Sequence, residues 1–301
     1  MKLATIYRDG GSAVTALEGE NLIALDAAFE LINEEPAPPF LWDMRTLLEA
    51  GEEAAALVEG IICDYKKRAP IGDDATIPLS EAVFAPPIIN PNKIICIGLN
   101  YRDHCIEQNR PFPERPILFS KFATALTGHR SNIIKPKITD QLDFEGELAF
   151  IIRDYCHRVE PENAMSYIAG YSIFHDVSAR EIQFGDKQWL RGKTFPTFAP
   201  MGPFFVTSDE IENPNSLALR TTLNGRVMQD SNTSEMIFDI PFLLSFISRA
   251  IPLFPGDIVA TGTPAGVGVF RKEPIFMTAG DEVEIFIEDF GTLSNTVVDE
   301  E

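Results

Sequence analysis

Residues 143–152 read DFEGELAFII, in which three acidic residues precede an apolar run suited to a buried strand. Alternation along a strand places Glu145 and Glu147 on one face and Gly146 on the other. Carboxylates about 7 Å apart on one face repel each other unless a positive charge lies between them. We therefore expect a divalent cation such as Mg²⁺, Mn²⁺ or Ca²⁺, with Asp176 as a third ligand. The alternative is an acidic strand face in solvent.

The chain around this motif, from residue 93 onward, has the pattern of a strand-rich domain. Strands are predicted at 93–99, 117–122, 145–153, 204–207, 217–227, 257–262 and 282–288, and helices at 161–169 and 235–249. Asn224-Gly225 lies between two alternating runs and predicts a type I′ hairpin.

The N-terminal residues have a different texture. Period-2 alternation at 2–8, 12–17 and 22–25 predicts a small antiparallel meander, and helices are predicted at 41–50 and 52–68. Residues 69–92 contain five prolines and no helical period, which indicates a linker or extended arm. The chain is thus predicted to be α+β and β-rich, with a small α+β domain (1–70), a Pro-rich linker (71–92) and a larger catalytic domain (93–301).

Composition excludes several classes of protein. The chain has 301 residues, 45% of them hydrophobic and 23% charged, as in soluble globular proteins. Its longest apolar stretch, 240–254, is interrupted by Arg249 and Pro252, so no membrane span is expected. The N-terminus becomes polar too early for a signal peptide, and the four cysteines form no CxxC pair. We expect a cytoplasmic protein without disulfides.

The charge is strongly negative but unevenly distributed. A net charge of −20 argues against nucleic acid or a membrane surface as a partner. Residues 93–193, however, contain 14 basic against 13 acidic residues. We therefore expect the functional site in this nearly neutral third of the chain.

A second candidate group lies in GLNYRDHCIE (98–107). A short helical segment there places His104 and Glu107 three residues apart, where a carboxylate can orient an imidazole as a general base for water. The alternative is a surface histidine with a glutamate nearby. Cys105 projects from a different side of such a helix, which disfavours a thiol nucleophile.

Further candidates are cationic and small polar residues. Lys121 lies in an apolar strand, where it must either extend to solvent or meet an anion. Arg180 and Gln183 come shortly after Asp176 and the apolar run that precedes it. Lys193 occurs later in the chain. The sequence ATGTPAGVG (260–268) predicts a tight turn where a ligand can approach the backbone, and it lacks the GK[ST] of a phosphate loop.

Seven sequence blocks follow one another in order: IGLNYRDH (97–104), DFEGELAFII (143–152), GYSIFHDVSAREIQ (170–183), RGKTFPTFAPMGP (191–203), LNGRVMQDSNTSEMIF (223–238), PLFPGDIVATGTPAGVG (252–268) and GDEVEIFIEDFGTLSN (280–295). Together they resemble the fumarylacetoacetate hydrolase superfamily, in its acylpyruvase and 2-hydroxyhepta-2,4-diene-1,7-dioate isomerase branch. The similarity covers residues 93–299. It implies a mixed β-roll catalytic domain, commonly dimeric, with a small N-terminal domain.

The resemblance also implies roles for the candidate residues. One Mg²⁺ or Mn²⁺ per chain would be bound by Glu145, Glu147 and Asp176. His104 and Glu107 would activate water from a segment that forms a lid, and Lys193 would be a third catalytic residue that holds the substrate's oxyanion. The substrate would also contact Lys121, Arg180, Gln183 and Thr261 or Thr263. The chain departs from the family at His175, where Asn is usual, and at Pro196, where Asp is usual. Both departures bear on substrate preference more than on metal binding.

The function predicted first is divalent-metal-dependent hydrolysis of a C–C bond in an acylpyruvate or related 2,4-dioxo acid. The first alternative uses the same metal enolate to isomerise or decarboxylate a 2-hydroxy-dienedioate or an oxaloacetate-like acid. A second alternative is a non-catalytic protein stabilised by Ca²⁺. In the enzyme interpretations the partners are a small anionic 2-oxo acid and a second copy of the chain, in a homodimer.

Overall fold

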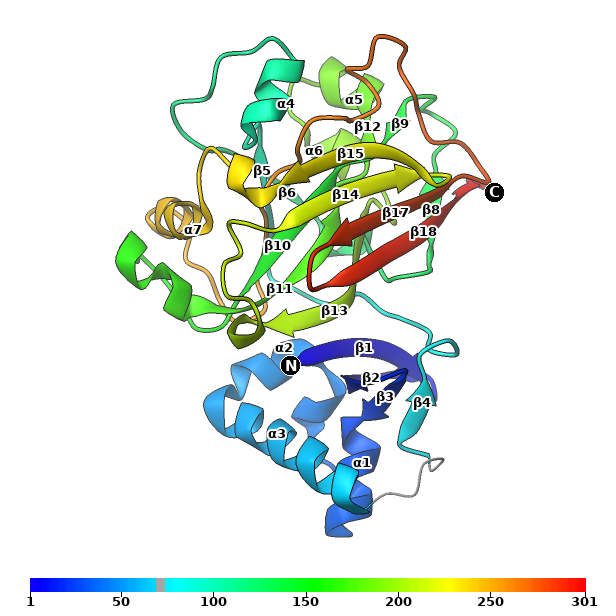
Figure 1. Ribbon diagram of the computed structural model, residues 1–301, viewed down its shortest axis with the longest axis vertical. Coiled ribbons are helices and arrows are strands. Elements are labelled where there is room, and N and C mark those ends of the chain that lie inside the picture. Colours follow the sequence, from blue (N-terminus) through cyan, green and yellow to red (C-terminus); the bar gives the residue numbers. More distant parts are fainter. Residues whose placement is uncertain (69–73) are drawn as a thin grey trace.

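The computed structural model describes residues 1–68 and 74–301, and one mixed sheet of eleven strands runs through most of it (Figure 1). The path of this sheet is β4 (Thr76–Pro78), β3 (Asn21–Ala24), β2 (Gly11–Glu18), β1 (Lys2–Arg8), β13 (Ala199–Thr207), β11 (Ile168–His175), β10 (Gly146–Ile152), β16 (Ile258–Ala260), β5 (Ile94–Gly98) and β6 (Ile117–Lys121), with β7 (Leu126–Thr127) paired to β13. The DFEGELAFII motif (143–152) contains β10, which lies near the middle of this sheet.

A second sheet packs against β10 and β11. Its order is β15 (Arg226–Asn232), β14 (Ala218–Leu223), β17 (Glu282–Ile287), β18 (Gly291–Asp299) and β8 (Asn132–Lys135). Phe150 of β10 belongs to the same buried apolar cluster as Leu219 and Ile285 of the second sheet. The α+β, β-rich architecture predicted from the sequence is confirmed.

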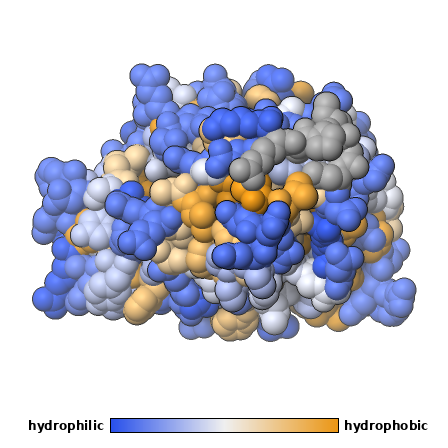
Figure 2. Space-filling model, turned by 90° about the horizontal axis from the view of Figure 1, so that it is seen from below, coloured by the Kyte–Doolittle hydropathy of each residue, from blue (hydrophilic) through white to orange (hydrophobic). Residues whose placement is uncertain are grey.

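The N-terminal part joins the first sheet directly. Leu3 of β1 pairs with Phe205 of β13, so the predicted N-terminal domain and the strand-rich part share one sheet. In Figure 1 this part lies below the rest, with α1 (Leu25–Asn33), α2 (Met44–Glu49) and α3 (Gly51–Arg68) on one side of the meander. Seen from below, its face is mostly hydrophilic around a central apolar patch (Figure 2).

The predicted linker contains regular structure. Residues 71–73 lie outside the described residues, but Thr76–Pro78 forms edge strand β4 beside β3. Farther along, Phe84 forms a bridge with Ile6, and the Ala85 amide donates to the Thr5 carbonyl over 2.9 Å. The described part of this segment thus lies along the sheet as an extended arm. The division of the chain into domains at 70 and 93 stays a prediction.

The predicted helices needed correction at several points. Helix α1 was not predicted, although Leu25, Ala28, Phe29 and Ile32 have helical spacing. The helix predicted at 161–169 is a 3-10 segment, Pro161–Tyr167. It ends there because residue 168 already pairs in β11. Helix α7 covers only Ile240–Ser248, since Asp239 caps it by accepting from the Phe242 amide. No helix in the described ranges is long and apolar enough to cross a membrane.

Candidate metal and active site

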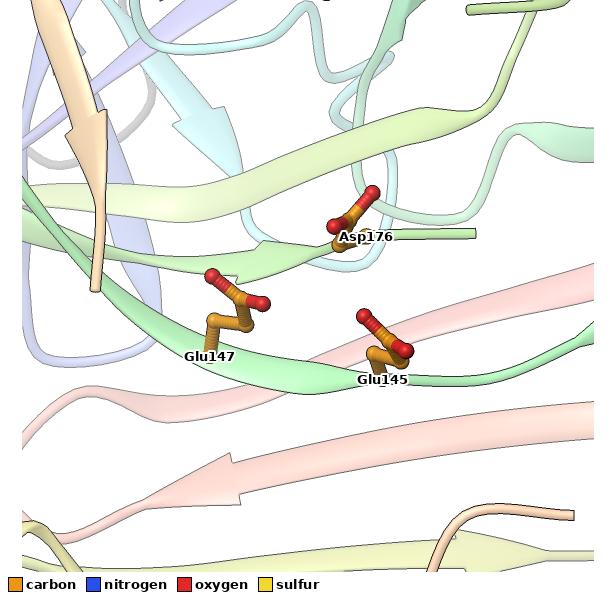
Figure 3. Close-up of side chains that lie close together, drawn as sticks. All are labelled: Glu145, Glu147 and Asp176. Atoms are coloured by element: carbon orange, nitrogen blue, oxygen red, sulfur yellow. The ribbon is translucent and has the colours of Figure 1, made fainter. Parts of the chain in front are cut away.

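The three predicted metal ligands meet where β10 and β11 lie side by side (Figure 3). Glu145 immediately precedes β10, Glu147 lies within it, and Asp176 immediately follows β11. The Asp176 amide donates to the Glu145 carbonyl over 2.9 Å, which fixes the two segments together. One ligand atom from each carboxylate lies within 4.8 Å of the others, and all three residues are buried. A solvated acidic strand face is therefore wrong.

Gly146 is required between the two glutamates because its face of β10 packs on the second sheet. An added Cβ would lie 2.4 Å from Thr221 Oγ1 and 3.1 Å from Ile285 Cγ2. The Gly146 amide also donates to Gln229 Oε1 over 2.9 Å. The packing that brings the second sheet close thus orients the carboxylates to the opposite side.

Cationic side chains surround two of the three carboxylates. Lys193 Nζ lies 2.7 Å from Glu145 Oε2 and 2.8 Å from Asp176 Oδ2. Lys121 Nζ lies 2.7 Å from Asp176 Oδ1 and donates to the backbone carbonyls of residues 177, 193 and 198. Arg180 bridges Glu145 to Asp143, with 2.7 Å to an oxygen of each. The predicted anion-binding cations therefore already hold carboxylates of the protein.

The third carboxylate, Glu147, forms no ion pair with any described residue. It accepts only the Gly262 amide, over 2.9 Å. Burial raises the pKa of Glu147 well above its usual range, and Asp176 and Glu145 raise it further. Burial by itself would raise the pKa of Glu145 as well, but Lys193 and Arg180 hold the pKa of Glu145 below its usual range.

These three carboxylates fit a divalent cation of the Mg²⁺ or Mn²⁺ type. Carboxylate oxygens are the ligands such ions prefer, and an ion would supply the positive charge that Glu147 lacks. The chemistry and burial of the donors thus agree with the predicted cofactor.

The predicted dyad forms on helix α4 (Arg102–Glu107). His104 Nδ1 lies 3.0 Å from Glu107 Oε2, and Glu107 Oε1 accepts the Gly266 amide over 2.9 Å. Gln108, which was not predicted, places its amide nitrogen 2.7 Å from His104 Nε2. Cys105 lies on another side of the helix, near the Leu99 carbonyl, and burial raises the pKa of its thiol. A thiol nucleophile has no support here.

A small cavity of about 100 Å³ connects the dyad to the acidic group. Seven of the predicted site residues line it: His104, Glu145, Glu147, Arg180, Gln183, Lys193 and Thr263. Lys121, Asp176 and Thr261 lie behind this layer; Thr261 Oγ1, for example, donates to the Leu148 carbonyl over 2.8 Å. Glu107 supports His104 from outside the cavity surface.

Several lining residues were not predicted: Gln108, Arg110, Phe119, Phe184, Trp189 and Phe270. Gln108 lies four residues after His104, so continuing the helical spacing would have found it, whereas Arg110 lies beyond the end of helix α4 and had no such signal. The aromatic residues had no such signal, because they come from separate segments. Asp143 was quoted in the motif without a role, yet it accepts the Gly268 and Val269 amides and thereby anchors the Gly-rich turn.

The two departures from the family pattern lie in different surroundings. His175 is fully buried, and neither ring nitrogen has a hydrogen-bond partner among the described residues. Burial lowers its pKa to about 3, with a further contribution from Lys121. Pro196 is exposed and does not line the cavity.

Comparison with known proteins agrees with this geometry. Residues 93–298 match the family model described as fumarylacetoacetate (FAA) hydrolase C-terminal. The chain is 45% identical over 257 residues to "Oxaloacetate tautomerase FAHD2A, mitochondrial" of Bos taurus, covering 85% of this chain and 79% of the relative.

Solved structures show the same fold over the whole chain. The fumarylacetoacetate hydrolase of Exiguobacterium antarcticum has a TM-score of 0.82 at 30% identity, with 100% of both chains covered. The maleylpyruvate hydrolase of Sphingobium sp. SYK-6, in complex with manganese(II) and pyruvate, has a TM-score of 0.79 at 27% identity, again with 100% of both chains covered.

Proposed function

The chain belongs to the fumarylacetoacetate hydrolase family, and we propose that it is a metal-dependent tautomerase of a 2-oxo dicarboxylic acid such as oxaloacetate. The observation that carries this proposal is the 45% identity to an oxaloacetate tautomerase across 85% of the chain. The sequence predicts C–C bond hydrolysis first and isomerisation second, and the relatives support the reverse order. The homodimer and the cytoplasmic location stay predictions.

The metal would be held by Glu145, Glu147 and Asp176. Such an ion supplies Lewis acidity that polarises the 2-oxo group and stabilises an enolate. Arg180 and Gln183 line the same cavity and limit where the substrate's oxygens can lie. Arg180 is itself fixed by Asp143 and Glu145, so its position is set before substrate binds.

Tautomerisation needs a group that moves a proton between the enol oxygen and C3 of the substrate. His104 can do this because Glu107 accepts a hydrogen bond from Nδ1, which leaves Nε2 to exchange the proton once the Gln108 amide turns away from it. The enol loses its O–H proton and C3 gains one, so no water is consumed. A single base in a small cavity is sufficient for this reaction.

Hydrolysis would require in addition a water molecule at His104 Nε2. That position faces the amide of Gln108 at 2.7 Å. The ring of Phe270 also lies beside the imidazole, with 5.9 Å between ring centroids. The Gln108 amide would have to turn away from Nε2 for either reaction, so the similarity to tautomerases, and not the space around this nitrogen, favours tautomerisation.

The experiment compares two reactions of the Mg²⁺- and Mn²⁺-loaded protein. Conversion of enol-oxaloacetate to the keto form is followed by the loss of enol absorbance, and cleavage of acetylpyruvate by acetate release. We expect tautomerisation to exceed cleavage by at least about 100-fold, and to fall by about 100-fold or more in His104→Ala and Glu145→Ala. Faster cleavage of acetylpyruvate than tautomerisation would contradict the proposal and restore hydrolysis as the main reaction.

A further inference from the structure

Three cationic side chains line the cavity, and two of them are already engaged. Lys193 contacts Glu145 and Asp176 at 2.7 and 2.8 Å. Arg180 contacts two carboxylates and donates to Gln183 Oε1 over 3.0 Å. Both are 2% exposed. Neither can turn to an incoming anion without leaving a carboxylate of the protein unpaired in a buried place, which is costly.

The third cation, Arg110, is free. Its guanidinium forms no ion pair or hydrogen bond with any residue in the described ranges, although it lines the cavity. Its position is nevertheless defined, because its backbone amide donates to the Cys105 carbonyl over 2.9 Å. Arg110 thus lies six residues after His104, beyond the end of helix α4, and is exposed at the solvent side of the cavity.

Among the described residues that line the cavity, no further lysine or arginine is present. Phe184, Trp189 and Phe270 line it, and the rings of Phe184 and Phe270 lie 6.3 Å apart. Aromatic faces are electron-rich and do not attract carboxylates. A second carboxylate that points away from the metal ligands thus has one available partner, the guanidinium of Arg110, which can bind it through two parallel hydrogen bonds.

We infer that Arg110 binds the distal carboxylate of the substrate and thereby selects 2-oxo dicarboxylates over 2-oxo monocarboxylates. This inference rests on the proposed function, since it names the substrate class of the same site. Arg110 contacts the substrate in this role but takes no part in the proton transfer.

The test compares a dianionic and a monoanionic substrate in Arg110→Ala, Arg110→Lys and the wild type. For enol-oxaloacetate, we expect kcat/KM of Arg110→Ala to fall by roughly 10- to 100-fold, mainly through KM, because a charged hydrogen bond is lost. For enol-phenylpyruvate, which has no second carboxylate, kcat/KM should change by less than about twofold. Arg110→Lys keeps the charge without the bidentate geometry and should recover part of the loss.

Arg115 provides a matched control, since it is an exposed arginine of the same segment that does not line the cavity. Arg115→Ala should leave both substrates unaffected. Equal losses for both substrates in Arg110→Ala, or no loss for either, would overturn the inference.

A binding measurement separates this inference from the proposed function. Titration calorimetry of the Mn²⁺-loaded protein should give weaker oxaloacetate binding in Arg110→Ala, with pyruvate binding unchanged. If the wild type tautomerises neither substrate but shows this difference in binding, the reaction is wrong and the role of Arg110 stands. If it tautomerises oxaloacetate and Arg110→Ala binds oxaloacetate as tightly as the wild type does, the role of Arg110 is wrong.

Discussion

Replacing Gly146 with alanine should weaken both the packing of the two sheets and the metal site. The added Cβ would lie 2.4 Å from Thr221 Oγ1, 3.1 Å from Ile285 Cγ2 and 3.3 Å from Gln229 Oε1. The first distance is shorter than the non-bonded contacts that Cβ atoms make in folded proteins, so Thr221 must rotate or β10 must move. Either response disturbs the strand that positions Glu145 and Glu147.

The size of the effect follows from the contacts that would be lost. Rotation of Thr221 breaks its 2.7 Å hydrogen bond to Gln229 Oε1, which is worth about 1 kcal/mol, and an extra methyl group in a filled core costs about 1–3 kcal/mol. Alanine offsets roughly 0.5 kcal/mol through its lower backbone entropy in the unfolded chain. We expect the free energy of unfolding to fall by about 1.5–3.5 kcal/mol.

Urea unfolding of the metal-free protein measures this change, and Mn²⁺ titration measures the effect on the site, where we expect weaker binding. Gly60→Ala is the matched control: nothing lies within 4 Å of its added Cβ, and in helix α3 it should stabilise by about 0.5–1 kcal/mol. Truncation of Thr221 to alanine should relieve the clash, so the double variant should lose less than the two single losses added together. If Gly146→Ala unfolded at the same urea concentration as the wild type, the predicted clash with Thr221 would be refuted.

Three further changes test other parts of the structure. Lys121→Met removes one of the two buried cations that contact Asp176 and the donor to three backbone carbonyls, so urea unfolding should show a loss of about 3 kcal/mol, and a loss under about 1 kcal/mol would contradict this. Burial lowers the pKa of His129 to about 4, from 6.5, so its contribution to stability is complete above pH 6.5 and lost as pH falls toward 4. Between pH 7 and 4.5 the wild type should therefore lose about 2 kcal/mol more than His129→Asn, and parallel curves would exclude this role. Glu107→Gln should lower kcat at least about tenfold, because the carboxylate that orients the His104 ring is lost, whereas a wild-type kcat would remove the dyad from the mechanism.

The sequence predicted the parts of the site that depend on short-range periodicity. Period 2 placed Glu145 and Glu147 on one face, and the spacing of three placed Glu107 against His104. Both relations hold within a stretch of three or four consecutive residues, so they depend little on the rest of the fold. Strands β5, β6, β10 and β17 were predictable for the same reason, whereas no strand was predicted over β18 and the helix predicted at 161–169 overlaps the start of β11.

Relations between distant segments were beyond such patterns. Pairing of Leu3 with Phe205 joins residues 202 positions apart, and neither strand encodes its partner locally. Similarly, nothing near Lys121 indicates that its ammonium group meets Asp176 and three backbone carbonyls. The sequence identified which residues are cationic, but three-dimensional packing decides whether each cation contacts the protein or a ligand.

The charges around the triad show why that distinction matters for substrate choice. Four buried acidic side chains face three buried cations there: Asp143, Glu145, Glu147 and Asp176 against Lys121, Arg180 and Lys193. With all of them ionised the group has one excess negative charge, and a divalent cation converts this to one excess positive charge. A single carboxylate then restores neutrality, whereas a second carboxylate adds a negative charge inside a protein whose net charge is already −20. Removal of Arg110 should therefore penalise dianions specifically, because the buried cations have no charge left to offer them.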